Sequence, residues 1–403
     1  MNRAVKAIKD TFSGMFFSGI NGCSVRRNPV PVDLMSEAEL KGIKGIRAWG
    51  DQYSRLFQED IVKSMRQERE GDFSVKPDGS AFYNVLALSG GGAHGAFAAG
   101  FLYGWTQAGS RLKFKLVTGI SAGALIAPCA FLGSDYDEEL KEMFTATTAK
   151  NVFHIRNFIS WLWSESFADT APLAKLIAKY ADETALEAIA EGHARGRRLY
   201  IGTTNLDAQR LVVWNMGAIA GSGYPDALQL FRKVLLASAS IPIAFPPVYF
   251  DVEAGGRLYD EMHVDGGTIT EVFFDGCMLD FAVARKEVFG QDAPKPGIAV
   301  YIIRNGKLTP SPQQVPRSLP KITRRALSTL NKAHGWDHLH HIYEMARRNQ
   351  VAFNYIDIPQ DFELPDKEAF DLEEMNRLFS LGVNLAKSGY QWHKLPPSLQ
   401  ESF

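Results

Sequence analysis

The chain has 403 residues, with 44 Lys and Arg against 45 Asp and Glu, and 46% of its residues are apolar. This composition excludes a disordered or collagen-like chain, and a net charge of −1 gives no attraction to a polyanion such as nucleic acid. The three cysteines are too few for a disulfide scaffold, and none lies in a CxxC metal-binding pair. We therefore expect a globular protein, with one large α/β domain and extensions or with two domains.

Residues 1–22 resemble the signal sequence of a bacterial lipoprotein. Basic residues precede a short apolar stretch, which ends at a glycine followed by Cys23. Under this interpretation Cys23 is lipidated and begins the mature chain, and residues 24–31 tether the protein to a membrane surface. Ser24, by resemblance to Gram-negative lipoproteins, favours the outer membrane, with the protein in the cell envelope facing the periplasm. The alternative is an unprocessed amphipathic helix, because Val5, Ile8, Phe12 and Met15 have helical spacing.

Residues 23–81 are predicted to be this tether, followed by a polar and helical N-terminal extension. Its sequence Ser36-Glu37-Ala38-Glu39 is that of a capping box, which is typical of a helix start. From residue 82 to residue 304 apolar strands alternate with helices, the pattern of a mostly parallel central sheet with helices on both faces. A loop rich in Pro, Ser and Gln then begins a mainly helical C-terminal extension, residues 305–403.

The predicted strands and helices alternate along this central region. The strands are 85–88, 114–117, 198–204, 211–216, 248–252 and 298–304, and the main helices are 96–107, 122–131 and 225–239. The C-terminal extension contains one strand-like stretch, 351–358. Residues 79–110 contain no Asp, Glu, Lys or Arg and by hydropathy alone could cross a bilayer. Because Gly90, Gly91, Gly92 and Gly95 interrupt this stretch, a buried strand, a turn and a buried helix describe it better.

Three short motifs contain the candidate catalytic residues: Gly90-Gly91-Gly92-Ala93-His94-Gly95, Gly119-Ile120-Ser121-Ala122-Gly123 and Asp265-Gly266-Gly267. We call the first the glycine loop. The second has the GxSxG pattern and lies between a predicted strand and a predicted helix, as in a nucleophile elbow. In such an elbow a sharp turn exposes the serine, and the glycines on either side relieve the crowding. Ser121 is therefore the candidate nucleophile.

The glycine loop is predicted to stabilise negative charge. It precedes Ser121 by one helix and one strand, so both turns lie at the same edge of a parallel sheet. Glycines leave backbone N–H groups uncovered, and such groups can bind the oxyanion of a tetrahedral intermediate. The alternative is a dinucleotide site, because Gly90, Gly92 and Gly95 also fit GxGxxG. That site needs an acidic residue about 20 positions further on, and none occurs between Gly95 and Asp135.

Asp265 is the candidate general base. In a Ser-His-Asp hydrolase a histidine follows the acid in the chain. The histidines after Asp265 all lie in the helical C-terminal region: His334, His338, His340, His341 and His393. A carboxylate followed by Gly266 and Gly267 in a loop is better placed to approach the serine directly, which favours a Ser-Asp dyad.

The three motifs, in this order, resemble those of the patatin-like phospholipases. The resemblance covers about residues 82 to 304, and residues 204–207 and 237–248 resemble further blocks of that family. The family hydrolyses lipid acyl esters with a Ser-Asp dyad. The resemblance therefore implies a three-layer α/β sandwich that acts as a lipid acyl hydrolase.

By the same resemblance, Ser121 is the nucleophile and Asp265 the base, and the N–H groups of Gly90, Gly91 and Gly92 form the oxyanion hole. Gly95, Gly119, Gly123, Gly266 and Gly267 complete the motifs. The implied partners are a lipid ester substrate and a membrane surface, with no cofactor and no metal. His94 is a departure, because the family usually has Arg or Lys at this position, and a fixed positive charge beside the oxyanion is then missing.

Other functions remain open at this point. One is an esterase that acts on neutral or small esters, and another is an envelope lipoprotein that binds lipid without catalysis. A dinucleotide-dependent oxidoreductase would use the GxGxxG pattern but lacks the acidic residue. The lipid head group, the acyl position and the oligomeric state are not predicted.

Residues 152–167 are rich in aromatic side chains and poor in charge, so they could line an acyl-binding mouth or contact a bilayer. A position in the core is the simpler interpretation. Cys129 and Cys277 lie in apolar surroundings and are expected to be buried thiols.

His334, His338 and His341 have the spacing of a metal-binding helix face. A helix start near Trp336 would leave His334 outside that helix, and a Ser-Asp pair needs no metal. No metal site is therefore predicted.

Overall fold

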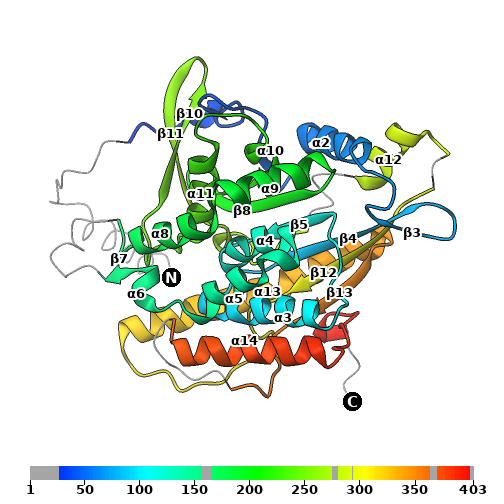
Figure 1. Cartoon of the computed structure of the whole chain (residues 1–403). Helices are drawn as coiled ribbons and strands as arrows, with labels where there is room; N and C mark the ends of the chain where they lie inside the picture. Colours follow the sequence, from blue (N-terminus) through cyan, green and yellow to red (C-terminus); the bar gives the residue numbers. More distant parts are fainter. Residues whose placement is uncertain (1–26, 156–164, 275–279, 293, 364–369, 400–403) are drawn as a thin grey trace, which may run out of the picture.

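The computed structural model describes residues 27–155, 165–274, 280–292, 294–363 and 370–399 (Figure 1). Its centre is a sheet whose middle strands are parallel, in the order β8, β5, β4, β12 and β13. Their bounds are Arg198–Asn205, Leu116–Gly119, Ala81–Leu88, Gly297–Ile303 and Ala352–Ile356. The prediction of a mostly parallel central sheet is confirmed.

Antiparallel strands extend this sheet. β9 (Arg210–Asn215) pairs with β8 and with β2 (Arg47–Trp49), and β3 (Ser74–Val75) pairs with β4. β11 (Arg257–Asp265) also pairs with β8, and it is followed outwards by β10 (Val248–Ala254) and β1 (Glu39–Leu40). β9 occupies one side of β8. The other side is shared by β5 and β11, which approach each other end to end.

Helices cover both faces of the sheet, as expected for three layers (Figure 1). Side chains of β4 alternate between the faces, with Leu86 and Leu88 on one and Val85 and Ala87 on the other. The first face is covered by α3 (Gly95–Gln107), α4 (Ala122–Leu132), α9 (Glu183–Ala194), α11 (Ala227–Ser238) and α14 (Leu372–Lys387). The second face is covered by α2 (Arg55–Arg66), α12 (Phe281–Phe289) and α13 (Leu319–Asn349).

Shorter elements complete the first face. They are α5 (Asp137–Thr145), α6 (Ala149–Val152), α8 (Ala171–Tyr180), α10 (Met216–Ala220) and the hairpin of β6 (His154–Ile155) with β7 (Ala168–Asp169). Residues 79–110 contain β4, the glycine loop and α3, as predicted. Among the helices of the described ranges, none is both long enough and apolar enough to cross a membrane.

Two predicted helix starts are wrong. The capping-box sequence at Ser36 does not begin a helix, because Glu39 and Leu40 form β1 and pair with β10 instead. Strand pairing over a long sequence distance thus overrides the local preference. The C-terminal helix begins at Leu319 rather than near Trp336, with a proline in its first turn, where a missing N–H costs nothing. His334 therefore lies inside α13.

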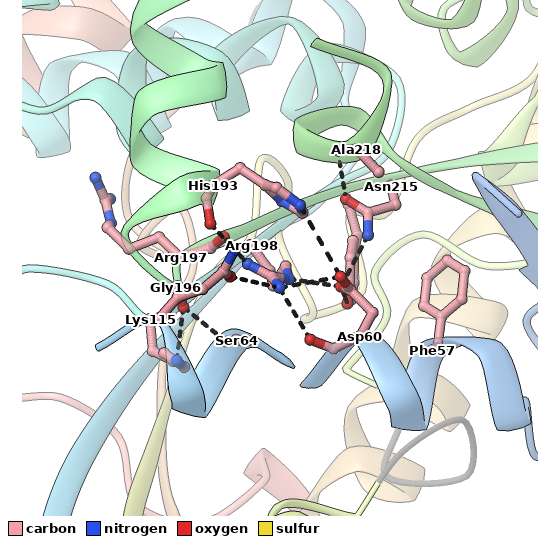
Figure 2. Close-up of polar contacts among 12 residues, drawn as sticks. Phe57, Asp60, Ser64, Lys115, His193, Gly196, Arg197, Arg198, Asn215 and Ala218 are labelled. Atoms are coloured by element: carbon pink, nitrogen blue, oxygen red, sulfur yellow. Dashed lines mark hydrogen bonds and ion pairs between the residues drawn. The ribbon is translucent and has the colours of Figure 1, made fainter. Parts of the chain in front are cut away.

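Helix α2 of the N-terminal extension is attached to the amino edge of the sheet through buried charges (Figure 2). Arg198, fully buried at the start of β8, donates hydrogen bonds to the Asp60 carboxylate at 2.5 and 3.0 Å. The Asn215 amide donates to the same carboxylate at 2.9 Å. Lys115, also fully buried, pairs with Glu68, and burial lowers the pKa of Lys115 to about 8. We call these paired groups the α2 clamp.

The first described residues are also attached to the body of the protein. Arg27 donates hydrogen bonds to both carboxylate oxygens of Asp207, at 2.9 and 2.7 Å, and to Asp260 at 2.7 Å. The Asn28 backbone N–H donates to Asp260. Residues 27–31 therefore belong to the folded domain, although they were predicted to be part of the tether. Cys23 lies outside the described residues.

Candidate active site

The register of the sheet brings Ser121 and Asp265 together. β5 ends at Gly119, which is opposite Ile201 of β8, and β11 ends at Asp265, which is opposite Thr203 of the same strand. Both strands lie along one side of β8, so the turn after β5 meets the end of β11. Candidate residues that are far apart in the sequence thus share one site at the carboxyl edge of the parallel strands.

Ser121 has the backbone geometry of a nucleophile elbow. Its φ of 54° is in the left-handed region, which is costly for a residue with a side chain and occurs mainly at functional turns. The flanking glycines are required by close contacts: a Cβ on Gly119 would lie 2.4 Å from the Gly123 oxygen, and one on Gly123 would lie 2.3 Å from the Leu88 oxygen. The Ser121 N–H donates to the Ser238 hydroxyl at 3.0 Å, which fixes the turn to α11.

Asp265 is buried beside this serine. Its side chain is only 4% exposed, and burial raises its pKa to about 7, although hydrogen bonds with Ser121 and Gly267 oppose the rise. The Gly267 N–H donates to the carboxylate at 2.7 Å. Gly266 lets this turn approach β8, since a Cβ there would lie 2.7 Å from the Gly202 oxygen. A carboxylate with such a pKa can accept or release a proton near neutral pH.

The glycine loop lies against the serine. A Cβ on Gly90 would lie 3.2 Å from the Cβ of Ser121, and a Cβ on Gly91 would lie 2.5 Å from the Asn305 carbonyl oxygen. The Gly90 N–H donates to the Glu271 carbonyl oxygen at 2.9 Å. Among the described residues, the N–H groups of Gly91 and Gly92 have no such partner. These two groups are therefore the candidate donors to an oxyanion.

Asn305 is a positioning residue that the motifs did not indicate. It follows β12, and its backbone N–H and side-chain amide donate to Ser89, just before the glycine loop, at 2.8 and 2.9 Å. Its side-chain oxygen accepts the Ala98 N–H at 3.1 Å. Asn305 is more than 200 residues away in sequence, so only the pairing of β12 with β4 reveals this contact.

His94 connects the glycine loop to the C-terminal extension. Its Nε2 lies 3.6 Å from a carboxylate oxygen of Glu374, at the start of α14. The sequence gave no indication of Glu374 as a partner. Gly95 begins α3, and a Cβ there would lie 2.7 Å from the Phe144 ring, so a larger residue would displace α3 from α5.

An apolar cavity of about 500 Å³, including its open mouth, lies beside Ser121. Its walls come from α4, α5, α6, α8, α14 and the loops before β10 and α14: Leu125, Met143, Phe144, Val152, Leu173, Leu176, Phe245, Phe370 and Met375, among others. A second cavity, lined by Cys129 and Tyr180, shares Leu125, Met143 and Leu176 with the first. The two cavities form neighbouring parts of one apolar region, which suits an alkyl chain.

Part of the aromatic stretch of residues 152–167 belongs to this region. Val152 lines the first cavity, and the ring of Phe153 packs against Phe245 and Phe370, which also line it. Residues 156–164 of that prediction lie outside the described residues.

The C-terminal histidines are separate from Ser121. His338 on α13 accepts the Glu271 backbone N–H at 3.3 Å, and none of the described hydrogen bonds of Ser121 or Asp265 involves a histidine. Within the described ranges, no group of three or more His, Cys, Asp or Glu could hold a metal ion. Cys129 is a buried free thiol, as predicted, and burial raises its pKa to about 12. Cys277 lies outside the described residues.

Comparisons with solved structures found distant similarities, among them the following three. VipD from Legionella pneumophila matches with 12% identity and a TM-score of 0.36, over 78% of this chain and 69% of VipD. ExoU from Pseudomonas aeruginosa, in complex with SpcU, matches with 13% identity and a TM-score of 0.30, over 76% and 52%. Human GIVD cytosolic phospholipase A2 matches with 9% identity and a TM-score of 0.34, over 78% and 55%.

A comparison with curated protein sequences found no significant match. The sequence comparison with protein families carries the assignment instead. Residues 86–278, which include the glycine loop, Ser121 and Asp265, match the family described as patatin-like phospholipase. The chain therefore carries a patatin-like phospholipase domain, and this domain supports a lipid acyl hydrolase.

Proposed function

We propose that the protein hydrolyses acyl esters of lipids with Ser121 as the nucleophile and Asp265 as the only general base. The observation that carries this proposal is the end-to-end approach of β5 and β11, which puts a strained serine beside a buried aspartate. The apolar cavity beside Ser121 supports a long acyl chain over a small ester.

In the proposed reaction the ionised Asp265 takes the Ser121 proton as the serine oxygen attacks the ester carbonyl. The N–H groups of Gly91 and Gly92 donate to the oxyanion, and the N-terminus of α4 favours its negative charge. Asp265 then protonates the leaving alcohol. A water molecule, losing its proton to Asp265, attacks the acyl-enzyme. Asp265 then returns this proton to the Ser121 oxygen as the bond to the acyl group breaks and the fatty acid leaves.

Labelling with a serine-reactive fluorophosphonate tests the proposal. We expect one labelled residue, Ser121, and complete loss of labelling and of ester hydrolysis in Ser121→Ala, with an unchanged circular dichroism spectrum. A lipid-binding protein without catalysis would not be labelled. Labelling at another serine, or hydrolysis that persists in Ser121→Ala, would overturn the assignment.

We also propose that the protein is anchored at the membrane surface by lipidation of Cys23, as the lipoprotein-like sequence of residues 1–22 predicts. Only residues 24–26 would then separate the lipid from Arg27, which is held by Asp207 and Asp260. At no more than about 3.5 Å per residue, the domain would lie within roughly 15 Å of the anchor.

A further inference from the structure

Helix α13 is much longer than the strands that it connects. It carries the chain from the end of β12 back to the start of β13, two parallel strands in register. A Cβ on Gly335 would lie 2.3 Å from Nη2 of Arg304, the residue that follows β12, so α13 passes the carboxyl edge of the sheet at Gly335. The part of α13 that packs on the sheet, with Leu339, Ile342 and Ala346 buried, lies beyond this point in the chain.

The preceding part, residues 319–334, therefore projects past the carboxyl edge. At 1.5 Å per residue its 16 residues extend by about 24 Å. Ile303 of β12, Leu88 of β4 and Gly119 of β5 share this edge through the sheet register. Ser121 follows Gly119 by two residues, so the projecting helix and the candidate active site lie at the same edge. We call residues 319–334 the projecting segment.

The projecting segment is amphipathic, but its apolar side faces solvent. Leu319, Ile322, Ala326 and Leu330 have the spacing of one helix face, and all four are exposed, Leu319 at 79% and Leu330 at 54%. Leu327 beside them is 46% exposed. A surface helix normally turns such a face to the core.

The opposite, basic side contacts the protein instead. Lys332 donates a hydrogen bond to the Thr309 carbonyl oxygen at 2.6 Å, and Arg325 donates to that of Ser311 at 2.6 Å. The loop of residues 305–318 is thus held against the polar side of the helix. An exposed apolar face in this orientation requires an apolar partner from outside the described fold.

The charge of this part of the sequence favours one kind of partner. Residues 305–336 contain six basic residues and no Asp or Glu: Lys307, Arg317, Lys321, Arg324, Arg325 and Lys332. Two copies of the segment would repel each other, because both carry this charge. A bilayer with anionic head groups attracts basic side chains and accepts leucine and isoleucine side chains into its acyl region.

We propose that the projecting segment docks on an anionic lipid bilayer and so presents the carboxyl edge of the sheet, with Ser121, to the lipid. This inference rests on the proposed function in one respect, namely that the substrate of Ser121 is a lipid. Binding to the bilayer does not depend on hydrolysis, so the two can be tested separately.

The test is cosedimentation of the full chain carrying Cys23→Ser and Ser121→Ala with phosphatidylcholine vesicles, with or without phosphatidylglycerol. These two substitutions remove the predicted lipidation site and the candidate nucleophile. We expect binding about tenfold tighter to the vesicles with phosphatidylglycerol, and a further weakening of that binding by salt.

Two variants on this background locate the surface. Leu319→Gln with Ile322→Gln and Leu330→Gln removes the apolar face, and Arg317→Gln with Lys321→Gln removes exposed charge. Each should weaken binding about tenfold. The matched controls lie at the amino edge, where Figure 1 places α2 and β3. Val75→Gln, at a residue that is 71% exposed, is the control for the apolar variant. Lys63→Gln with Arg66→Gln is the control for the charge variant. The controls should bind like the parent protein.

Equal binding to both kinds of vesicle, or equal effects of test and control variants, would overturn the proposal. Sedimentation velocity adds a second criterion: a dimer that the leucine variant dissociates would identify a second copy as the partner. With Ser121 restored, hydrolysis of a water-soluble ester should be unchanged in these variants. If the parent protein with Ser121 does not hydrolyse this ester, the result counts against the proposed function and not against docking.

Discussion

The backbone N–H of Gly90 donates a hydrogen bond to the Glu271 carbonyl oxygen at 2.9 Å. Glu271 lies six residues after Asp265, so this bond connects the glycine loop to the segment that carries the candidate base. Gly90 is thus held in place against Ser121, and its N–H is not available to an oxyanion in this geometry. Stabilisation of the oxyanion then depends on Gly91 and Gly92.

A matched pair of glycine variants tests the loop. Both Gly91 and Gly92 have positive φ, so alanine is strained at either position. Only at Gly91 would the new Cβ also meet backbone, 2.5 Å from the Asn305 oxygen, whereas at Gly92 it would meet open space. We expect Gly91→Ala to lower kcat about 10²-fold and Gly92→Ala to have a clearly smaller effect. Similar losses in steady-state kinetics of both variants would contradict this account.

Asp265→Asn should lower kcat by about 10²- to 10⁴-fold, because an amide cannot take the Ser121 proton. In the parent protein kcat/KM should rise with pH through about 7, where the buried carboxyl group ionises. A pH–rate profile of short-ester hydrolysis measures both effects. An equal loss on substitution of His338 would indicate a triad instead of a dyad.

The same raised pKa predicts a change in stability. Between the ordinary pKa of 3.8 and about 7 the folded protein holds the Asp265 proton and the unfolded chain releases it. Stability is therefore lost as pH rises through this range and stays low above it. Asp265→Asn lacks this loss, so its Tm should exceed that of the parent at pH 8, and the difference should vanish near pH 4.

His94→Arg should preserve or raise activity. Arginine carries a permanent charge and can pair with Glu374, whose carboxylate lies 3.6 Å from the His94 ring. Because such pairs contribute modestly, we expect a change in kcat of at most about fivefold. If the Glu374 carboxylate neutralises the new charge, the double variant His94→Arg with Glu374→Gln should have a higher rate than His94→Arg alone. A large loss in His94→Arg would reveal a specific role for the imidazole.

Leu176→Trp tests the apolar region as an acyl site. The path along α4 from Ser121 to Cys129 is about 12 Å, which an extended chain of roughly eight to ten carbons spans at ~1.5 Å per C–C bond. A ring at Leu176, which both cavities share, should block this path. We expect p-nitrophenyl butyrate hydrolysis to be retained and decanoate hydrolysis to fall about tenfold or more.

Lys175→Trp is the matched control, because it adds the same ring at an exposed position one residue away on α8. It should leave the ratio of the two rates unchanged. A Leu176→Trp variant with the parental ratio would show that the acyl chain lies elsewhere.

The mature protein is predicted to begin at Cys23 with attached acyl chains. Stable anchoring needs more than one acyl chain, since a single chain binds a bilayer only marginally. Mass spectrometry of the N-terminal peptide from membrane-extracted protein measures this directly. A chain that still begins near Met1, with a free Cys23 thiol, would support the amphipathic-helix alternative.

The sequence was informative where local pattern and tertiary structure agree. The alternation of apolar strands and helices predicted the central sheet because those strands are buried on both faces. The GxSxG motif located the elbow because its glycines meet a local constraint, the contact of Gly119 with Gly123. Asp265 was predicted as the base from a turn motif and by elimination of histidines, and the structure places it beside Ser121.

Long-range partners had no local pattern. The glycine loop is contacted from three different parts of the chain, by Asn305, Glu271 and Glu374. Single polar residues in a sequence do not reveal such contacts. The early start of α13 was missed for a different reason. Gly335 lies inside this helix, and glycine is a poor helix former, so the sequence favoured a start just after it.

The α2 clamp bears on where an independently folding unit begins. The family match starts at residue 86, after α2, yet Arg198 and Lys115 inside the matched region are completely buried against Asp60 and Glu68 outside it. Replacing Asp60 and Glu68 by neutral residues would leave two cations in the interior without counter-charges, at about 3–5 kcal/mol each. That sum approaches the whole stability of an ordinary domain, about 5–15 kcal/mol. The catalytic sheet and the helix that precedes it must therefore unfold as one cooperative body, and selection on either constrains the other.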